Sequence, residues 1–556
     1  MATGAARERG PGWVLWLALA LTWFATLQIR PLLDPDEGRY AEIPREMVAS
    51  GDWVTPRLDG LKYFEKPPLQ YWATAAAYSV FGMSEWTSRL WEVGLAFLCL
   101  PMVYAWGSRL YGRRAGLAAL AALATSPYFV IVSHLNLLDA GFTFWLTGML
   151  FAFALAQNSP TGSAAERRWM LVTWAAAALA VLSKGIVVGV LAGLTLILYS
   201  VLERDVRPWR RLHLLTGVPL FLVIAAPWFI AVIRRNPDFA QFFFIHEHFA
   251  RFLTTVHQRV EPWWYFLPLL VLGVAPWIKA ATGSMRRAWF DPGVTAQFRP
   301  QKFLQIFAAV TLIFFSLSGS KLAPYILPMM PPLAALVGVH AAQRPGFMAV
   351  AGWVSVGLLC LVAIGLVIYG VVTNGYFPDL TVLWAGAAIV FALLTAGIVW
   401  RQPQTMPVAP VLLMCAATVL GWQCLMTAYS HTPPARSSKD LVAIASEEIH
   451  PQTVLYSVGQ YRHTISAYLQ RTMVLVGFQG ELEFGLQAEP GKQSASSQDF
   501  MTRWQSSPDA VAFFSPGVYD DYRLLGLPGR VIVADGVTVV VSRNEFPDSA
   551  SADPQP

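Results

Sequence analysis

Long apolar runs separated by short polar segments make up most of this chain. A helix that crosses a bilayer core needs about 20 apolar residues, with a range of about 17 to 25. The chain offers about thirteen such runs, of which the fifth and sixth are short and meet at Ser183 and Lys184. The expected spans are 13–30, 90–109, 115–132, 140–157, 169–183, 186–202, 212–233, 263–281, 303–318, 323–342, 347–372, 379–400 and 407–428. The pattern predicts a mainly α-helical, polytopic membrane protein.

Positive charge alternates between the loops that join these runs. Lys and Arg are concentrated in Arg7 and Arg9, 109–114, 166–168, 203–211, 286–302, Arg344 and Arg401. Loops of this kind face the cytoplasm. The intervening loops, 31–89, 133–139, 183–186, 234–262, 318–322 and the C-terminal region, should face outward. We therefore expect a cytoplasmic N-terminus and, with an odd number of spans, an outer C-terminus. The first run leads into RPLLDPDE instead of a small-residue cleavage site, so we expect an uncleaved membrane helix.

The composition changes after Tyr429. The runs TVLYSVG, TMVLVGF, AVAFFS and VIVADGVTVVVSR are short, rich in β-branched residues and bounded by turn residues, which predicts strands. LVAIASEEI (441–449) predicts a helix. We expect a membrane domain over 1–429 that includes an outer loop at 31–89, a soluble α/β domain over 430–546, and a disordered tail over 547–556.

Composition supports a membrane protein and excludes other classes. Charged residues make up 13% of the chain, against about 25% in soluble domains, and the 22 Trp residues suit membrane–water interfaces. The net charge of +6 is scattered between apolar runs, so no nucleic-acid partner is expected. The four cysteines lie in apolar runs without a CxxC pattern, which argues against disulfides and cysteine metal sites.

The outer loop after the first span is unusually rich in charged and aromatic residues. Asp36 can cap a helix that begins at Glu37, and at helical spacing Asp36, Arg39 and Tyr40 share one face while Glu42 and Glu46 share another. Ordinary ion pairs on interfacial helices explain any one of these charges. They explain the whole loop less well, because packing at a lipid boundary does not require so many charges.

Three further charges interrupt apolar sequence: Asp139, Lys184 and Lys321. A charge at the centre of a membrane helix costs about 2.5–3.5 kcal/mol, so such residues are functional candidates. The alternative is a structural pair between Asp139 and Lys184. By the predicted topology all three lie on the same outer side as Asp36, which predicts that separate segments converge there.

The outward segment 237–264 is aromatic and amphipathic, so part of it should lie in the interface. His246 and His248 are two residues apart and point to opposite sides of a helix, so they should not bind one ion together. One of them can join a distant carboxylate in a metal site. The alternative is two interfacial histidines beside a Glu247–Arg251 pair.

The motif DPDEGRYAEIPREM followed by GLKYFEKPPLQYW resembles the lipid A aminoarabinose transferases, bacterial relatives of the protein O-mannosyltransferases in the C-type glycosyltransferase superfamily. The turns LLDAG, LSKG and SGSKLAPYILP and the segment HEHFARF follow in the same order, so the resemblance covers essentially the whole chain. It implies about thirteen membrane helices with interfacial helices in the outer loop. It also implies a bacterial inner-membrane location with a periplasmic C-terminal domain.

The resemblance further implies the transfer of a sugar, usually 4-amino-4-deoxy-L-arabinose, from undecaprenyl phosphate to a lipid A phosphate, which gives resistance to cationic antimicrobial peptides such as polymyxin. We expect a monomer in membrane lipid with no nucleotide cofactor. Carried over by position, the catalytic carboxylates are Asp36 and Asp139, the cations for the donor phosphate are Lys66 and Arg251, and the ligands of a structural or positioning zinc ion are Glu65 and His246. Arg39 and Lys184, which line the same cavity, are expected to act with the catalytic carboxylates, and the remaining cavity positions are Tyr40, Tyr63, Lys321 and Tyr325.

Simple chemistry agrees with this assignment. A polyprenyl phosphate is a good leaving group when fixed cations meet its developing charge, and an arginine can do so with two parallel hydrogen bonds. A phosphate acceptor has a second pKa of about 6 and is largely dianionic at neutral pH, so Asp36 would organise neighbouring cations. A hydroxyl acceptor would instead need Asp36 as a base.

Other functions remain open at this point. The same donor chemistry serves O-glycosyltransferases that act on protein or another glycan, and another amino sugar can be delivered to lipid A. A transporter would show inverted repeats and broken helices at mid-membrane. The sequence has no such repeat, and its buried charges gather on one side.

Overall fold

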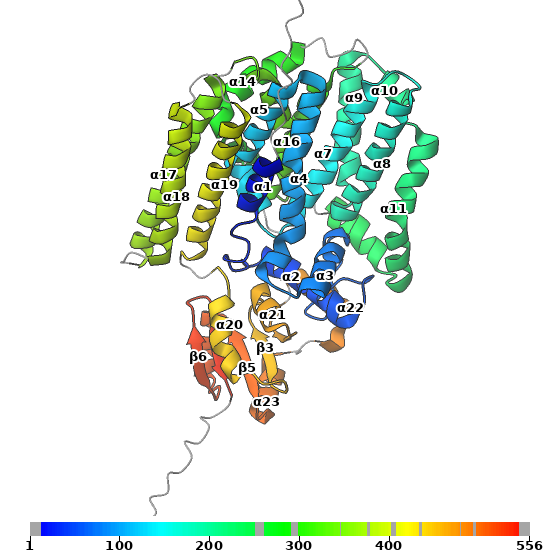
Figure 1. Ribbon diagram of the computed structural model, residues 1–556. Helices are drawn as coiled ribbons and strands as arrows, with labels where there is room; N and C mark the ends of the chain where they lie inside the picture. Colours follow the sequence, from blue (N-terminus) through cyan, green and yellow to red (C-terminus); the bar gives the residue numbers. More distant parts are fainter. Residues whose placement is uncertain are drawn as a thin grey trace, which may run out of the picture. The chain divides into compact units, whose positions relative to one another are not determined.

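A computed structural model (Figure 1) describes residues 13–250, 261–290, 298–344, 346–374, 379–401, 407–432, 436–478, 480–492 and 496–543. The chain forms two compact units. The first, called the helical unit, comprises Met1–Ile29, Glu65–Ala73 and Arg89–Tyr429. The second, called the mixed unit, comprises Arg30–Phe64, Thr74–Ser88 and Ser430–Pro556.

Helices make up the helical unit, and many of them follow the predicted spans. They are α1 (Trp13–Trp23), α4 (Glu85–Tyr111), α5 (Arg113–Ala124), α6 (Pro127–Ser133), α7 (Leu138–Gln157), α8 (Ala164–Lys184), α9 (Val187–Glu203), α10 (Arg207–Arg210), α11 (Leu214–Arg235), the π-helix η1 (Gln241–Ala250), α13 (Phe266–Val274), η2 (Ala275–Trp277), α14 (Ile278–Phe290), α15 (Pro300–Leu317), η3 (Ala323–Met329), α16 (Met330–Ala341), α17 (Gly346–Asn374), α18 (Asp379–Arg401) and α19 (Val408–Ser430).

Nine helices among the described residues are long and apolar enough to cross a membrane, and the bent pair α5 and α6 makes a tenth candidate. The bend is 63°. It has a local cause, because Pro127 cannot donate the next hydrogen bond of α5 and Ser126 caps α6 by accepting from the Phe129 amide. The other expected spans lie on α1, α8 and α9, so a mainly helical membrane protein is confirmed and the count of thirteen stays a prediction.

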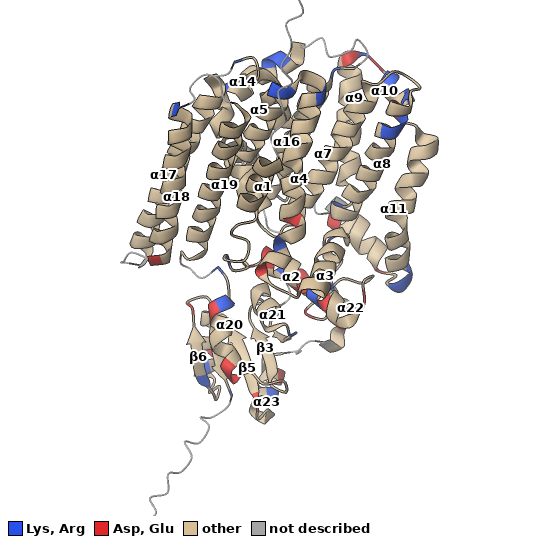
Figure 2. Cartoon of the chain, viewed as in Figure 1, with Lys and Arg blue, Asp and Glu red and all other residues tan. Residues whose placement is uncertain are grey.

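The two ends of the helical unit carry different charged residues. Figure 2 shows Lys and Arg gathered near α10 and α14 at one end. At this end the buried Arg211 contacts Glu166 at 3.0 Å and donates to the backbone carbonyls of Gln157 and Ser159, both at 2.7 Å, which ties the polar loops together. Asp139 at the start of α7 and Lys184 at the end of α8 lie at the other end of the unit, away from Arg211. Which end faces the cytoplasm stays a prediction.

The mixed unit contains the predicted α/β fold. Its sheet has the order β4-β3-β5-β7-β6, in which β3 is parallel to β4 and β5, and β7 is antiparallel to β5 and β6. Its elements are α2 (Asp36–Ser50), β1 (Arg57–Leu58), β2 (Leu61–Lys62), most of α3 (Leu69–Phe81), α20 (Lys439–Ala445), η4 (Ser446–Glu448), β3 (Val454–Val458), α21 (His463–Leu469), β4 (Val474–Val476), η5 (Gly480–Leu482), α22 (Glu483–Ala488), η6 (Pro490–Lys492), α23 (Ser497–Ser506), β5 (Ala510–Phe514), α24 (Pro516–Leu524), β6 (Arg530–Ala534) and β7 (Val539–Ser542).

A buried aromatic cluster forms the core of this sheet domain. Phe500 and Trp504 of α23 pack against Tyr456, Phe514 and Tyr522. Aromatic side chains bury large areas and dominate core energetics, so this cluster fixes α23 against the sheet. The first part of the outer loop, 30–64, belongs to the same compact unit as this domain, which brings α2 into contact with residues more than 400 positions later in the chain.

Candidate active site

Asp36 and Arg39 form an ion pair at the start of α2. Asp36 Oδ1 lies 2.9 Å from a terminal nitrogen of Arg39, and the Arg39 guanidinium lies 5.7 Å from the centre of the Tyr40 ring. The expected shared face of these residues is therefore present. The prediction that Asp36 caps a helix beginning at Glu37 is wrong, because α2 already includes Asp36 and no side chain caps it. Its carboxylate binds Arg39 instead.

Glu481 is the second partner of Arg39. Arg39 Nε donates to Oε1 at 3.1 Å and a terminal nitrogen donates to Oε2 at 2.5 Å, while His463 Nε2 also bonds to Oε1. Burial alone would raise the pKa of Glu481, but Arg39 and His463 outweigh it and hold that pKa at about 2. Burial likewise favours a lower pKa for Arg39, yet the nearby Tyr63, Glu481 and Asp36 raise that pKa well above its ordinary value. Arg39 is therefore a fixed cation.

The DPDEG motif holds α2 against α21. Asp34 accepts hydrogen bonds from the Thr464 amide at 2.9 Å and its hydroxyl at 2.6 Å, and from Arg462 Nε at 3.0 Å. A Cβ at Gly38 would lie 2.6 Å from the Thr464 backbone nitrogen, a distance that real Cβ atoms do not adopt. Glycine at this position therefore allows the close backbone contact that places Arg39 beside Glu481.

Other carboxylates of the outer loop have structural partners. Glu42 accepts two hydrogen bonds from Arg45, at 2.7 and 2.6 Å. Glu46 accepts from the Gly60 amide at 2.9 Å, and Asp59 accepts from the Met473 amide at 2.7 Å. Burial raises the pKa of both Glu46 and Asp59 to about 8. The high density of carboxylates thus has a partly structural cause.

In the helical unit, Asp139 and Lys184 form an ion pair. Asp139 lies in the first turn of α7, and Lys184 is the last residue of α8. Lys184 Nζ also lies 4.7 Å from the centre of the Tyr325 ring, so three predicted site residues meet here. Glu92 of α4 accepts from the amide of Gly141, two residues after Asp139, at 2.5 Å. The pair proposed as the structural alternative is therefore present, and a catalytic role for it stays a prediction.

Lys66 lies between backbone and carboxylate oxygens in the same unit. Its Nζ donates to the Glu65 carbonyl at 2.9 Å and to Glu247 Oε2 at 3.4 Å, and it lies 3.8 Å from Glu65 Oε2. Glu247 therefore binds Lys66, whereas Arg251, its expected helical partner, lies outside the described residues. A phosphate near Lys66 would compete with two carboxylates.

Glu65 and His246 are the two predicted zinc ligands. Within the described residues, no group of three or more His, Cys, Asp and Glu side chains is placed to hold a metal ion. The His246 ring stacks on Phe242 with centres 5.2 Å apart. One carboxylate and one imidazole are chemically suited to zinc, and ligation of the ion by Glu65 and His246 stays a prediction.

Lys321 is buried and donates to the Ser318 carbonyl at 2.7 Å. An apolar cavity of about 510 Å³ lies among helices that include α7, α8, α9 and α11, and none of the predicted site residues lines it. The expectation that Tyr40, Tyr63, Lys321 and Tyr325 line one cavity therefore stays a prediction.

Four residues in these contacts were not predicted from the sequence: Glu92, Glu247, His463 and Glu481. Glu247 lies between two histidines, and Glu92 interrupts an apolar run near its start, so both had a visible signal. His463 and Glu481 had none, because nothing local connects them to the outer loop.

Two family profiles match the chain. One described as the aminoarabinose transferase C-terminal domain matches residues 441–543, and one described as dolichyl-phosphate-mannose-protein mannosyltransferase matches residues 15–243. The undecaprenyl phosphate-alpha-4-amino-4-deoxy-L-arabinose arabinosyl transferase of Pseudomonas aeruginosa (strain UCBPP-PA14) is 31% identical over 532 residues, covering 93% of this chain and 95% of the relative. This chain belongs to the aminoarabinose transferase family.

Two further similarities point to the same family. The enzyme of the same name from Aeromonas hydrophila subsp. hydrophila is 30% identical over 71% of this chain and 77% of its own length. The crystal structure of ArnT from Cupriavidus metallidurans bound to undecaprenyl phosphate superimposes with a TM-score of 0.85 at 33% identity, over 97% of this chain and 99% of that one. The expected resemblance, fold class and enzyme class are confirmed: the chain is a membrane glycosyltransferase.

Proposed function

We propose that this protein transfers 4-amino-4-deoxy-L-arabinose from undecaprenyl phosphate to a lipid A phosphate at the periplasmic face of the bacterial inner membrane. The name of its relatives specifies this donor sugar. The observation that carries the proposal is the close agreement of the fold with a transferase that holds undecaprenyl phosphate. The added amino group would make lipid A less anionic and so give resistance to cationic peptides such as polymyxin.

The donor phosphate needs cations when the bond to the sugar breaks. Lys66 supplies one from a partly buried position, and Arg251 supplies another in this proposal. Fixed cations in a site of low dielectric stabilise the charge that develops on a leaving phosphate. The two carboxylates beside Lys66 hold it in place, and phosphate binding exchanges Glu247 for a stronger anionic partner. A single displacement then inverts the configuration at the sugar carbon without a covalent enzyme intermediate.

The contacts of Asp36 favour a role in positioning Arg39 over a role as a base. Its carboxylate is bonded to Arg39, which Glu481 also holds. The carboxylate is thus already engaged by a fixed cation, as an organising role requires. A lipid A phosphate is largely dianionic at neutral pH and does not need a strong base. This arrangement therefore suits a phosphate acceptor better than a hydroxyl acceptor.

A bound zinc ion at Glu65 and His246 is part of the proposal as a structural or positioning ion. Zinc would fix the Glu65 carboxylate and with it the backbone carbonyl that accepts from Lys66. Metal analysis of the purified chain should find zinc, and Glu65→Gln with His246→Ala should lose it. Absence of zinc in the unchanged chain, with activity insensitive to chelator, would remove the ion from the account.

Mass spectrometry of lipid A from cells with and without this protein tests the proposal. We expect the mass of one aminoarabinose added at a phosphate only when the protein is present. A different amino sugar at that position would correct the donor and leave the reaction class in place. Unchanged lipid A together with a newly glycosylated protein or glycan would replace the proposed acceptor.

A further inference from the structure

A second polar site lies at the basic end of the helical unit, opposite to the end that holds Asp139 and Lys184. It is a cavity of about 720 Å³ lined by α14 and the end of α16. This volume is in the range of small-molecule sites, about 300–1,000 Å³. The lining residues are Lys279, Thr282, Gly283, Arg286, Arg287, Phe290, His340 and Arg344.

Positive charge dominates this cavity. Four of the eight lining residues are Lys or Arg, a fifth is His340, and none is acidic. Among the described residues, no carboxylate forms an ion pair with Lys279, Arg286, Arg287 or Arg344. Elsewhere at this end, by contrast, Lys302 and Arg211 each have a glutamate partner. Within the part of the chain that the structure describes, these four cations therefore lack the carboxylate partners that Lys302 and Arg211 have.

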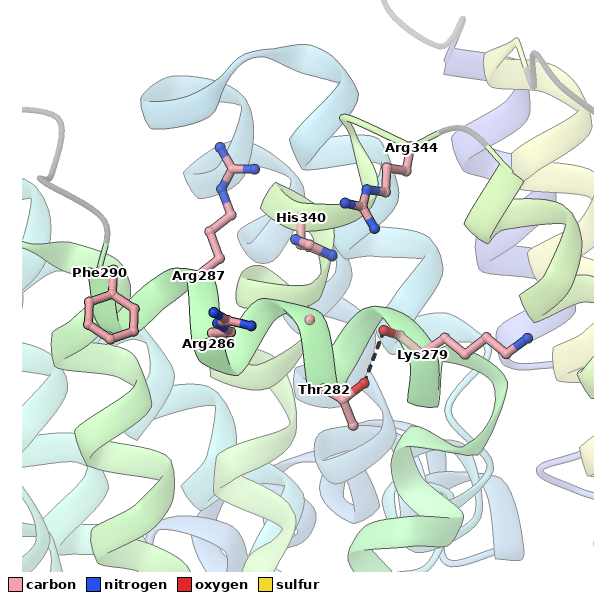
Figure 3. Close-up of a pocket in the computed structure, with 8 residues that line it drawn as sticks. Lys279, Thr282, Arg286, Arg287, Phe290, His340 and Arg344 are labelled. Atoms are coloured by element: carbon pink, nitrogen blue, oxygen red, sulfur yellow. Dashed lines mark hydrogen bonds between the residues drawn. The ribbon is translucent and has the colours of Figure 1, made fainter.

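Two separate segments bring these cations together. Figure 3 shows Arg286 and Arg287 on α14 and Arg344 after α16, with His340 between Arg287 and Arg344. Gly283 allows the approach, because a Cβ there would lie 2.4 Å from His340 Nε2. Arg287 is oriented by a hydrogen bond to the Gln343 side chain. Cytoplasmic loops are basic for reasons of topology alone, but topology does not require cations of two helices to surround one cavity.

We propose that this cavity binds the phosphate headgroup of an anionic phospholipid. Arginine forks match phosphate oxygens with paired hydrogen bonds, and basic pockets between membrane helices on the cytoplasmic side suit such headgroups. A lipid fits better than a soluble phosphate because apolar side chains on the same helix, Ile278 and Phe290, are exposed beside the cations. Those side chains offer a surface along which acyl chains can lie.

The binding of lipid to the purified full-length chain tests this proposal. The chain is transferred into phosphatidylcholine nanodiscs that contain a minor fraction of phosphatidylglycerol or cardiolipin, and bound lipid is counted by native mass spectrometry. Each cation near a membrane surface strengthens binding of anionic lipid about fivefold. The double variant Arg286→Gln with Arg344→Gln should therefore weaken retention roughly 25-fold. Both side chains are exposed, so the variant should fold, and Lys279→Gln provides an independent second test.

The matched control is Arg167→Gln with Arg168→Gln, which removes two exposed cations from α8 outside the cavity. It should retain lipid as the unchanged chain does. Equal retention by the cavity variant, or equal loss by the control, would overturn the proposal. Displacement of the lipid by millimolar inorganic phosphate would also overturn it, in favour of a site for soluble phosphate. Because the assay does not involve sugar transfer, its result is independent of the proposed enzymatic function.

Discussion

The contact between Arg39 and Glu481 can be weakened selectively by Glu481→Gln. The glutamine has the size of the glutamate and keeps one oxygen that can accept from Arg39, but it cannot carry the charge. Arg39 is nearly buried, with 4% of its side chain exposed, and its other carboxylate partner, Asp36, is 38% exposed. The substitution therefore leaves a buried cation with a single, more solvated counterion.

The size of the effect follows from the pKa of Glu481. A value of about 2, against an ordinary 4.5, corresponds to about 3 kcal/mol at about 1.4 kcal/mol per pKa unit. Loss of one partner from a buried pair costs about 3–5 kcal/mol. Since glutamine retains one acceptor, we expect about 2–3 kcal/mol. Because the pKa is lowered, this stabilisation is present above pH 4.5 and is lost as the pH falls towards about 2.

Hydrogen–deuterium exchange measures this loss where it occurs. At neutral pH, protection of the amides of α2 and α21 should fall by a factor on the order of 100 in Glu481→Gln. The control is Glu483→Gln, an exposed glutamate two residues away whose carboxylate accepts a hydrogen bond from Gln487 within α22. Unchanged protection in Glu481→Gln, or an equal change in both variants, would refute the claim that this pair holds α2 to the C-terminal region.

Three further outcomes are expected. Gly38→Ala should cost about 1–3 kcal/mol, because its Cβ meets the backbone of α21; an unchanged melting temperature would contradict this. Glu46 has a pKa raised from 4.5 to about 8, so the folded state loses stability as the pH rises through that window. Glu46→Gln should reduce this loss of stability, measured as the change in melting temperature between pH 5 and 8. An unchanged dependence of the melting temperature on pH would exclude Glu46 as the source of the loss. Lys66→Ala and Asp36→Asn should abolish sugar transfer while membrane expression stays normal, and for Lys66→Ala the rate should fall by at least about 100-fold. Full activity in either variant would remove that residue from the proposed centre.

The helical part of the fold was predictable because its cause is local. Each membrane span needs a continuous apolar run, and the structure has helices in every expected range. The strands after Tyr429 are likewise visible as short β-branched runs that end at turn residues. The pairing of Asp139 with Lys184 was weighed from the cost of burying a lone charge, and the structure contains that pair.

Other features depend on contacts between distant segments. The grouping of α2 with the C-terminal region rests on Asp34, Gly38 and Arg39, whose partners lie more than 400 residues away. A single sequence holds no record of such contacts. The proposed capping by Asp36 was wrong for a related reason, since a cap competes with an ion pair and the nearby Arg39 binds the carboxylate. The density of carboxylates pointed to the outer loop, but it did not distinguish the carboxylates that have structural partners, such as Glu42 and Glu46, from the proposed functional ones.

Transfer by the purified chain tests the central claim most directly. The chain is incubated in detergent with undecaprenyl phosphate-linked aminoarabinose and lipid A, and the lipids are analysed by mass spectrometry with fragmentation. We predict one aminoarabinose on a lipid A phosphate with the unchanged chain and none with Lys66→Ala. Lipid A that stays unmodified with the unchanged chain would contradict the account.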